Sequence, residues 1–447
     1  MVRPTEISLT PGAHRNERPP GSNDAALRAI ATAALQACDA YALTERALAR
    51  HSSDFHTAES LYVVAAGKAA AGMVRALLDA HGARVRAGVV ASAARPPALD
   101  SRFQGFAAGH PLPNDGSVGA GRAALSLAGH CRDDAPLVVL LSGGASALLA
   151  VPADGVSLSD KIAVSSALLR AGTAIAPFNA VRKHLSAIKG GQLAARARRS
   201  ITFAISDVHA PVEDDPAVIG SGPTVADATT YGDALRALRD AGVADSIPSA
   251  ARARIDAGVR GDAPETIKPG DPRLDRAAFI VAGGRKDALD GAEAQARALG
   301  YDVERIDAPT LGEARDTGRA FVERAAAVAA SPGRRRCVLA AGETTVNVRG
   351  RGTGGRNQEF VLGALEALSR LDGASLASLG TDGIDGPTEA AGAMADSSTL
   401  SRARAAGLDP VRALAENDAY PFFRALGDLI VTGPTGTNVG DLQILLL

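Results

Sequence analysis

The sequence predicts an α/β protein with two domains, the first built on a largely parallel sheet with helices on both faces. Short apolar runs alternate with longer segments rich in alanine and leucine, which is the pattern of consecutive β-α-β units. Glycines cluster directly after the apolar runs, where strands lead into loops. The chain has 447 residues, more than one hydrophobic core usually supports, so we expect two domains with a cleft between them.

The predicted strands are short and mostly apolar throughout, as expected for strands that are covered on both faces. In chain order they are residues 62–66, 88–91, 137–141, 201–206, 279–282, 337–341, 375–379, 428–431 and 442–446. The longer segments between them predict helices, because apolar residues recur there with helical spacing. These helices are residues 25–49, 68–81, 159–170, 179–197, 287–299, 311–330 and 356–370.

The predicted division into domains follows from local composition. Residues 1–24 contain several arginines and prolines but no apolar core of a signal peptide, so we expect a disordered tail. Residues 259–275 are rich in glycine and proline and show little periodicity, which predicts a linker. We therefore expect one domain at residues 25–269 and a second at residues 270–447.

Charge and cysteine content narrow the classes of function. The 48 basic and 49 acidic residues give a formal net charge of −1, which argues against nucleic acid or an anionic membrane as the main partner. No apolar stretch approaches the roughly 18 residues of a membrane span. The cysteines, Cys38, Cys131 and Cys337, are widely separated and indicate neither disulfides nor a zinc site. We expect a cytoplasmic protein that acts on a small molecule.

Residues 342–360 give the strongest functional signal, because they join an apolar strand to the start of a helix. Four glycines of this segment, at 350, 352, 354 and 355, allow the backbone to approach a ligand closely. The helix start offers unpaired N–H groups and the positive end of the helix dipole. Arg356 stands there, and its planar guanidinium suits a phosphate or carboxylate. The alternative is a surface hairpin with an exposed arginine.

Two loops of the first domain offer similar chemistry, at strand ends where open parallel sheets bind their ligands. Strand 62–66 is followed by Lys68 at a helix start, where the ammonium could neutralise an anion. An exposed lysine without a ligand is the alternative. Consecutive N–H groups after strand 137–141 could form a phosphate-binding nest or simply a tight turn. The residues of that loop are Ser142, Gly143, Gly144 and Ser146.

Carboxylates follow two further strands. Asp207 comes after strand 201–206 and could hold Mg²⁺, which proteins bind through one or two carboxylates together with substrate phosphates. Asp382 and Asp385 lie in a glycine-rich turn after strand 375–379. They could hold a metal or take a proton from a substrate hydroxyl, and Asx-turns are the alternative.

Standard cofactor signatures are missing from the sequence. There is no P-loop motif, no dinucleotide fingerprint after the first strand, and no serine-hydrolase elbow. Lysine, arginine, backbone N–H groups and carboxylates remain. These are the parts that phosphoryl transfer needs, since its catalysis consists mostly of positioning and charge neutralisation.

Longer motifs carry a resemblance to a known family. AGKA at 66–69, AGHP at 108–111, LSGGASAL at 141–148, NAVRKHLS at 179–186, SDV at 206–208 and SGPT at 221–224 resemble the first domain of the glycerate 2-kinases. Four further motifs are similar to the C-terminal MOFRL domain of that family: GETT at 342–345, GGRNQE at 354–359, GTDGIDGP at 380–387 and TGPTGTN at 432–438. The match runs from about residue 25 to the end of the chain.

The resemblance implies a Rossmann-like N-terminal domain and a mixed α/β C-terminal domain of MOFRL type. It also implies phosphorylation of D-glycerate to 2-phospho-D-glycerate with ATP and Mg²⁺ in the cleft between them. Lys68 and Arg356 correspond to the family's proposed active-site lysine and arginine. We expect Asp382 or Asp385 to act on the 2-hydroxyl and Asp207 to help hold Mg²⁺. The other expected contacts to substrate or nucleotide are Glu343, Thr344, Gly355, Asn357, Thr437 and Asn438, beside the loop at 142–146.

Some questions stay open at the level of sequence. The loop at 206–215 is longer than the family pattern, so its metal ligand is uncertain. Family members have been labelled hydroxypyruvate reductases, and an NAD(P)H-dependent oxidoreductase is the alternative function. A binding protein for sugar phosphates without turnover is a third. The sequence also leaves the oligomeric state open, with a homodimer among the options.

Overall fold

The computed structural model describes residues 10–11, 23–94, 100–327 and 335–447. The chain forms two compact units. Unit 1 consists of Met1–Asp39 and Gly283–Leu447, and unit 2 consists of Ala40–Ala282. Most of the predicted tail at 1–24 lies outside the described residues, apart from a short strand and the start of the first helix. Within the described chain, no helix combines the length and apolar character needed to cross a membrane.

Unit 2 contains a six-stranded sheet in the order β4-β3-β2-β5-β6-β7. Its strands are β2 (Leu61–Ala66), β3 (Val85–Ser92), β4 (Phe103–Ala107), β5 (Leu137–Leu141), β6 (Ser200–Ile205) and β7 (Ala277–Gly283). The pairs β4–β3, β3–β2, β2–β5 and β5–β6 are parallel. The predicted parallel sheet of the first domain is therefore confirmed.

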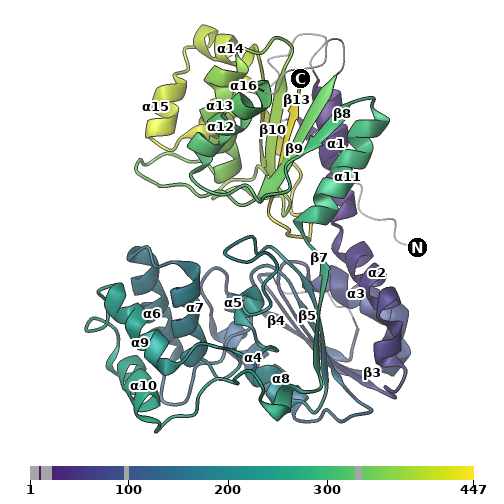
Figure 1. The fold of residues 1–447 in the computed structure, drawn as a ribbon, viewed down its shortest axis with the longest axis vertical. Helices are drawn as coiled ribbons and strands as arrows, with labels where there is room; N and C mark the ends of the chain where they lie inside the picture. Colours follow the sequence, from purple (N-terminus) through teal and green to yellow (C-terminus); the bar gives the residue numbers. More distant parts are fainter. Residues whose placement is uncertain (1–9, 12–22, 95–99, 328–334) are drawn as a thin grey trace. The chain divides into compact units, whose positions relative to one another are not determined.

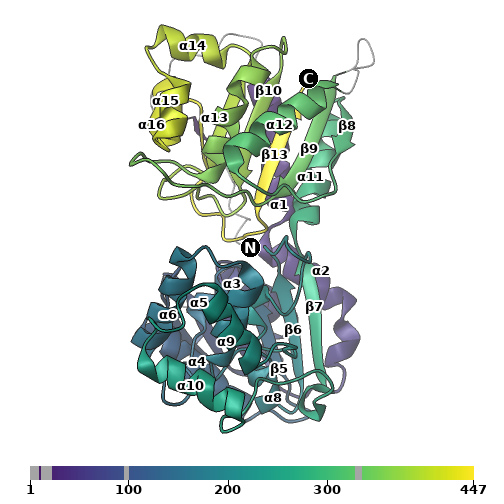
Figure 2. The same ribbon diagram turned by 60° about the vertical axis from the view of Figure 1, so that its left-hand side comes forward.

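Helices cover both faces of this sheet, as Figure 1 shows. The helices of unit 2 are α2 (Ala40–Arg50), α3 (Ala70–His81), α4 (Asp115–Ala128), α5 (Ala145–Leu148), α6 (Leu158–Arg170), α7 (Ile175–His184), α8 (Gln192–Arg196), α9 (Tyr231–Asp240) and α10 (Ser249–Arg260). Small residues of α4 pack against alternate residues of β2, β3 and β5 in one buried cluster. A second cluster joins α6, α7, α9 and α10 into a helical layer of their own, visible in Figure 2.

Unit 1 contains a seven-stranded sheet in the order β1-β12-β11-β10-β13-β9-β8. Its strands are β1 (Thr10–Pro11), β8 (Asp302–Arg305), β9 (Arg336–Gly342), β10 (Ser375–Gly380), β11 (Gly392–Asp396), β12 (Leu429–Val431) and β13 (Asp441–Leu446). The β8–β9 pair is parallel and the other pairs are antiparallel, so the predicted mixed sheet of the C-terminal part is confirmed.

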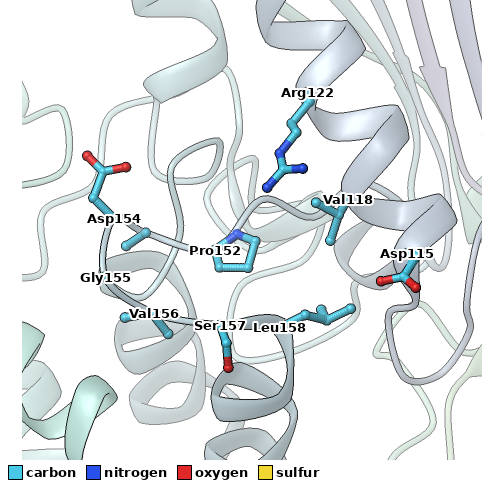
Figure 3. A pocket seen from close by; sticks show the side chains of 10 residues that line it. Asp115, Val118, Arg122, Pro152, Asp154, Gly155, Val156, Ser157 and Leu158 are labelled. Carbon is cyan, nitrogen blue, oxygen red and sulfur yellow. The ribbon is translucent and has the colours of Figure 1, made fainter.

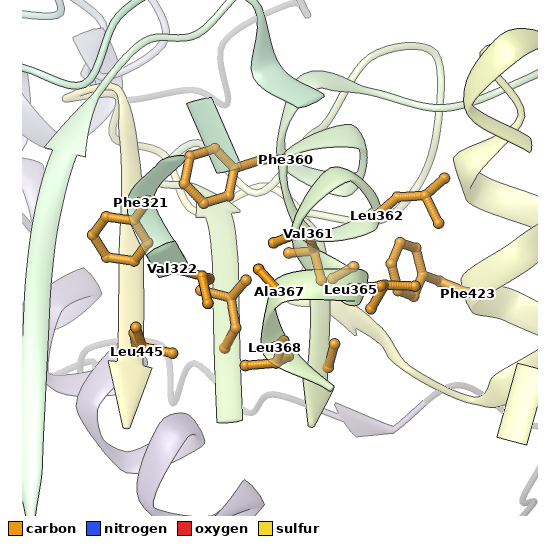
Figure 4. Close-up of a cluster of buried hydrophobic side chains, with 14 of the residues drawn as sticks. Phe321, Val322, Phe360, Val361, Leu362, Leu365, Ala367, Leu368, Phe423 and Leu445 are labelled. Carbon is orange, nitrogen blue, oxygen red and sulfur yellow. The ribbon is translucent and has the colours of Figure 1, made fainter. Parts of the chain in front are cut away.

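The core of unit 1 lies between this sheet and a layer of helices. Val338, Leu376 and Leu445 are neighbours in the register of β9, β10 and β13, and they face α12 (Ala314–Ala327) and α13 (Arg356–Leu368). Figure 4 shows Leu445 together with Phe360 and other apolar side chains of this cluster. The remaining helices are α1 (Asp24–Ala37), α11 (Arg285–Ala298), α14 (Thr399–Ala405), α15 (Pro410–Ala415) and α16 (Ala419–Leu426). Helices α1 and α11 pack against each other.

Two predicted helices are each divided in the structure. The predicted helix at 25–49 is α1 and α2, which belong to different units. The predicted helix at 179–197 is α7, which ends at His184, and α8, which begins at Gln192; Gly190 and Gly191, with φ of +58° and +81°, lie in the turn between them. Part of the predicted helix at 311–330, residues 328–330, lies outside the described residues.

The division between the units differs from the predicted boundary at residue 270. The last residue of unit 2 is Ala282. The segment that we expected to be a linker is held within unit 2 by hydrogen bonds to Asp227. The backbone N–H of Asp227 donates to Ile267 O, and the hydroxyl of Thr266 donates to the carboxylate of Asp227. A segment with few regular elements can still be bonded firmly to its neighbours.

Candidate functional site

The start of α13 in unit 1 places Arg356 between two carboxylates. Its Nε and Nη2 donate to Asp441 Oδ2 and Oδ1 at 2.7 and 3.0 Å, and its Nη1 lies 2.9 Å from Glu343 Oε1. The side chain of Asp441 has no exposed surface, whereas that of Arg356 is 30% exposed. Burial lowers the pKa of Arg356, but Asp441 and Glu343 outweigh it and hold the pKa above its usual range.

Strand pairing brings the two carboxylates together. Asp441 begins β13 and lies opposite Gly342, the last residue of β9, so Glu343 follows directly beside it. Asp441 was not among the predicted site residues. Its partners explain its burial, since Asn357 Nδ2 also donates to Asp441 Oδ1 at 2.9 Å.

Asp385 binds the first turn of α13. Its Oδ1 accepts from Asn357 N at 3.0 Å and its Oδ2 from Gln358 N at 2.9 Å. Burial raises the pKa of Asp385 to about 7, although the two N–H donors act in the opposite direction. Gly355 makes this approach possible, because a Cβ there would lie 2.3 Å from Asp385 Cγ. Asp385 therefore caps the helix that carries Arg356.

Asn357 connects this group to the sheet. Its Oδ1 accepts from Ser378 Oγ at 2.6 Å, and its Nδ2 lies 3.3 Å from Asp385 Oδ1. Asp382, in the same loop as Asp385, accepts the backbone N–H of residue 384 at 3.1 Å and is nearly buried.

The other predicted residues of unit 1 have different partners. Thr437 Oγ1 donates to Cys38 O at 2.6 Å, which ties this loop to the end of α1. Asn438 Oδ1 accepts from Gly440 N at 3.4 Å. Thr344 is buried, and its hydroxyl has no hydrogen-bond partner within the described part of the chain. A buried hydroxyl without a partner is uncommon and points to an absent ligand or water.

Two predicted loops of unit 2 lie in contact. Lys68 is exposed just before α3, and its backbone N donates to Gly143 O at 2.9 Å. Ser142 Oγ accepts from Ala69 N at 3.0 Å. Gly67 has φ of +131°, and a Cβ there would lie 2.1 Å from Ser142 Oγ, so only glycine fits this crossing. The structure thus brings Lys68 and the loop at 142–146 together.

The loop at 142–146 continues into the short helix α5. Gly144 has φ of +87°, and a Cβ there would lie 2.9 Å from His110 Cδ2. Ser146 Oγ and Ser221 Oγ are 2.9 Å apart, a contact between two motifs far apart in the sequence. Sequence reasoning placed Ser221 in the family pattern but did not select it as a site residue.

The predicted metal ligand Asp207 follows β6 and is partly buried. The loop after it folds back on itself, since Asp214 N donates to Val208 O at 3.0 Å. Among the described residues, no group of three or more histidines, cysteines or acids is placed to hold a metal by itself. Mg²⁺ in phosphoryl-transfer sites needs only one or two carboxylates beside the substrate phosphates, so this donor set is compatible with it.

A separate pocket of about 350 Å³ lies in unit 2 between α4 and the loop before α6. Figure 3 shows Arg122 and Asp154 on its walls. None of its lining residues belongs to the predicted site, so we assign it no part in the chemistry.

Comparison with known proteins identifies two family matches along the chain. Residues 26–256 match the family described as "Domain of unknown function (DUF4147)", and residues 336–441 match the MOFRL family. A D-glycerate 2-kinase from Thermotoga maritima is 38% identical over 394 residues, which cover 86% of this chain and 90% of that protein. A relative from Agrobacterium vitis, provisionally named a hydroxypyruvate reductase, is 39% identical over 86% of this chain and 98% of its own.

The fold agrees with these relatives. The crystal structure of a glycerate kinase from Thermotoga maritima superposes with a TM-score of 0.79 at 34% sequence identity. The match covers 94% of this chain and 97% of that one. Similarity at this level, over nearly the whole length, shows that the chain belongs to the glycerate 2-kinase family.

Proposed function

We propose that this protein transfers a phosphoryl group from ATP to the 2-hydroxyl of D-glycerate, with Mg²⁺, and so is a glycerate 2-kinase. The observation that carries the proposal is the near full-length similarity to the D-glycerate 2-kinase of Thermotoga maritima. The enzyme class is a phosphotransferase. Each unit has polar groups at its strand ends that would supply the charge neutralisation and positioning that such a transfer needs.

In unit 1, we assign Arg356 to the transferring phosphate. Its bonds to Asp441 and Glu343 use three of the five N–H groups of a guanidinium. The remaining two can donate to a phosphate oxygen. Two carboxylates on one guanidinium leave a net negative charge, which suits a phosphate already neutralised by Mg²⁺ better than a bare carboxylate.

The two aspartates after β10 take separate roles in this proposal. Both carboxylate oxygens of Asp385 accept backbone N–H groups of α13, so Asp385 is a positioning residue for Arg356. Asp382 remains the candidate that accepts the proton of the 2-hydroxyl. Glu343, Thr344, Asn357 and Asn438 would complete the contacts to substrate and nucleotide in unit 1.

In unit 2, Lys68 would neutralise charge on the γ-phosphoryl group, and the loop at 142–146 would bind phosphates through its backbone. Asp207 would be a ligand of Mg²⁺, and the ion would neutralise phosphate charge when bound. Thr437 holds the end of α1 and has a positioning role. The cytoplasm, where ATP is supplied, is the proposed compartment, and a homodimer stays a prediction for analytical ultracentrifugation.

Incubation of the purified full-length chain with ATP, Mg²⁺ and D-glycerate tests the function, with products resolved by ³¹P nuclear magnetic resonance. We expect ADP and 2-phosphoglycerate in equal amounts. Formation of 3-phosphoglycerate alone, or no ADP, would contradict the proposal. The name of the Agrobacterium vitis relative favours one second candidate, reduction of hydroxypyruvate. Oxidation of NADH or NADPH by hydroxypyruvate without ATP would establish that activity instead.

A further inference from the structure

Unit 2 gathers four cationic side chains that are not among the predicted site residues. Lys161 comes from α6, Arg182 and Lys183 come from α7, and Lys189 lies in the turn after α7 (Figure 1). The three lysines are only 4%, 5% and 1% exposed, in that order. Burial of a charge costs several kcal/mol unless a counter-charge and hydrogen bonds compensate it.

One carboxylate is paired with this group. Lys183 Nζ lies 3.3 Å from Asp227 Oδ1. Lys161 Nζ donates to two backbone carbonyls at 3.0 and 3.1 Å, and Lys189 Nζ does the same at 3.3 and 3.1 Å. Carbonyl oxygens satisfy the donors but bring no negative charge. Burial and the neighbouring cations together lower the pKa of Lys189 far below its ordinary value.

Arg182 is the cation of this group that lacks any acceptor. Its guanidinium lies over the ring of Phe178, 5.1 Å from the ring centre. Within the described residues the guanidinium makes no hydrogen bond or ion pair, and Arg182 is only partly buried. Burial lowers its pKa to about 10. A planar fork of N–H donors on a ring, open to solvent on one side, is a geometry that binds carboxylate or phosphate.

A neutral donor lies one turn before Arg182. Asn179 is 3% exposed, and its Oδ1 accepts from Ser221 Oγ at 3.3 Å. The Nδ2 group of Asn179 makes no hydrogen bond in the described part of the chain, and it is not among the fully buried atoms that lack a partner, so it keeps access to solvent or to a ligand. Residues three apart on a helix are neighbours, so this amide and the guanidinium of Arg182 present donors on the same side of α7.

Ser221 connects these donors to the predicted phosphate loop. Its hydroxyl lies 2.9 Å from Ser146 Oγ, and the carbonyl of Gly220 accepts from Lys189 Nζ. Ser221 is fully buried and has φ of +62°. A left-handed backbone at a residue other than glycine costs on the order of 1 kcal/mol and occurs often at ligand sites.

We propose that Arg182 and Asn179 form an oxyanion-binding subsite of unit 2 for a carboxylate or phosphate group of the kinase substrates. Lys161 anchors α7 beside it, through the backbone carbonyls of residues 182 and 185. The subsite adjoins the loop at 142–146, so it rests on the proposed function and adds residues to the same half of the site. Either the carboxylate of glycerate or a phosphate of the nucleotide has the required chemistry.

Calorimetric titration of the full-length chain distinguishes these two sources. D-glycerate and ADP with Mg²⁺ are titrated separately into the wild type and into Arg182→Gln. We expect binding of one of the two to weaken at least tenfold. The weakened ligand identifies the bound group, and weakening of both would indicate a position that both share. Arg254→Gln is the matched control, because Arg254 also lies over a ring in unit 2, that of Tyr231 at 5.9 Å. The dissociation constants of Arg254→Gln for D-glycerate and for ADP should both stay within twofold of the wild-type values.

Asn179→Asp gives an independent test that does not depend on removal of a charge. The new carboxylate would supply the missing counter-charge, so we expect a higher melting temperature together with binding weakened at least tenfold. A purely structural asparagine would give a lower or equal melting temperature and unchanged binding. Arg182→Gln and Asn179→Asp variants that bind both ligands as the wild type does would overturn the subsite.

The outcomes separate the subsite from the proposed function. A wild-type chain that binds D-glycerate or ADP, loses that binding in Arg182→Gln and yet makes no phosphoglycerate supports the subsite and contradicts the kinase. A wild-type kinase whose binding is insensitive to both substitutions supports the kinase and contradicts the subsite. A wild-type chain that binds neither ligand contradicts both.

Discussion

Asp441→Asn is the substitution that most directly tests how Arg356 is held. The replacement keeps the shape of the side chain and an oxygen for Asn357, but it removes the negative charge that Arg356 contacts at 2.7 and 3.0 Å. The asparagine amide also places a donor where the arginine needs an acceptor. The side chain at 441 is fully buried, so water cannot replace the lost partner.

The expected loss of stability follows from the burial of the pair. Removal of one partner from a buried ion pair costs about 3–5 kcal/mol, because the other charge is left without compensation. Arg356 is 30% exposed and keeps its contact with Glu343 at 2.9 Å. We therefore expect the low end of that range, about 3 kcal/mol. For a unit of about 200 residues this corresponds to a decrease in melting temperature of about 6–12 °C.

Thermal unfolding followed by circular dichroism measures the stability, and the phosphoglycerate assay measures kcat/KM. Asp428→Asn is the matched control, because Asp428 is also fully buried in unit 1 and pairs with Arg402 at 2.6 Å. Both variants should lose similar stability, but only Asp441→Asn should lower kcat/KM, by about 100-fold if Arg356 contacts the transition state. An Asp441→Asn enzyme with a melting temperature within 2 °C of wild type would refute the structural reasoning. Equal loss of kcat/KM in both variants would show that the effect is not specific to Arg356.

Three further predictions concern the same half-sites. Lys68→Ala should lower kcat/KM by at least 100-fold. The melting temperature should not change, because the side chain of Lys68 is exposed. Partial rescue of kcat/KM by Lys68→Arg would indicate a charge effect, and a normal kcat/KM in Lys68→Ala would exclude Lys68 from the site. Gly355→Ala should destabilise unit 1 by about 1–3 kcal/mol in thermal unfolding, because the new Cβ would lie 2.3 Å from Asp385 Cγ. Gly232→Ala is the control and should be neutral or stabilising, because no atom would lie nearer than 3.4 Å to its Cβ. Burial raises the pKa of Asp385 to about 7 from 3.8, so the free energy of unfolding should fall as pH rises from about 4 to about 7. In Asp385→Asn, the free energy of unfolding measured by urea titration should depend less on pH between about 4 and about 7. An unchanged dependence on pH would contradict the raised pKa of Asp385.

The parts of the fold that the sequence predicted well are those with strong apolar periodicity. Strand β5 has its predicted bounds, and the β9 and β13 strands lie within one residue of theirs. The strands that were missed have weak signals for physical reasons. Strand β4 is largely exposed, β8 consists mainly of charged residues, and β11 consists of small residues. Their place at a sheet edge or under a helix depends on tertiary contacts that no local pattern records.

The candidate site could likewise be predicted from the sequence only in part. Glycine-rich strand ends can be recognised in sequence, because the close backbone approach at Gly67 and Gly355 admits no side chain. Asp441 could not be recognised, since it precedes an apolar strand and meets Arg356 only through the antiparallel register of β9 and β13. The choice between Asp382 and Asp385 likewise needed the hydrogen bonds of α13, which place Asp385 as a cap.

Helix α1 has a consequence for how the chain is made. It precedes residues 40–282 in the chain, yet it packs against α11, and Thr437 bonds to the residue after its end. Residues 40–282 can complete their own core during synthesis, while α1 must wait for partners that follow residue 282. The C-terminal portion produced alone would lack α1 and leave exposed the surface that buries Leu27, Ile30 and Leu35. Assembly of unit 1 therefore requires α1 to join elements that are synthesised only after the whole of unit 2.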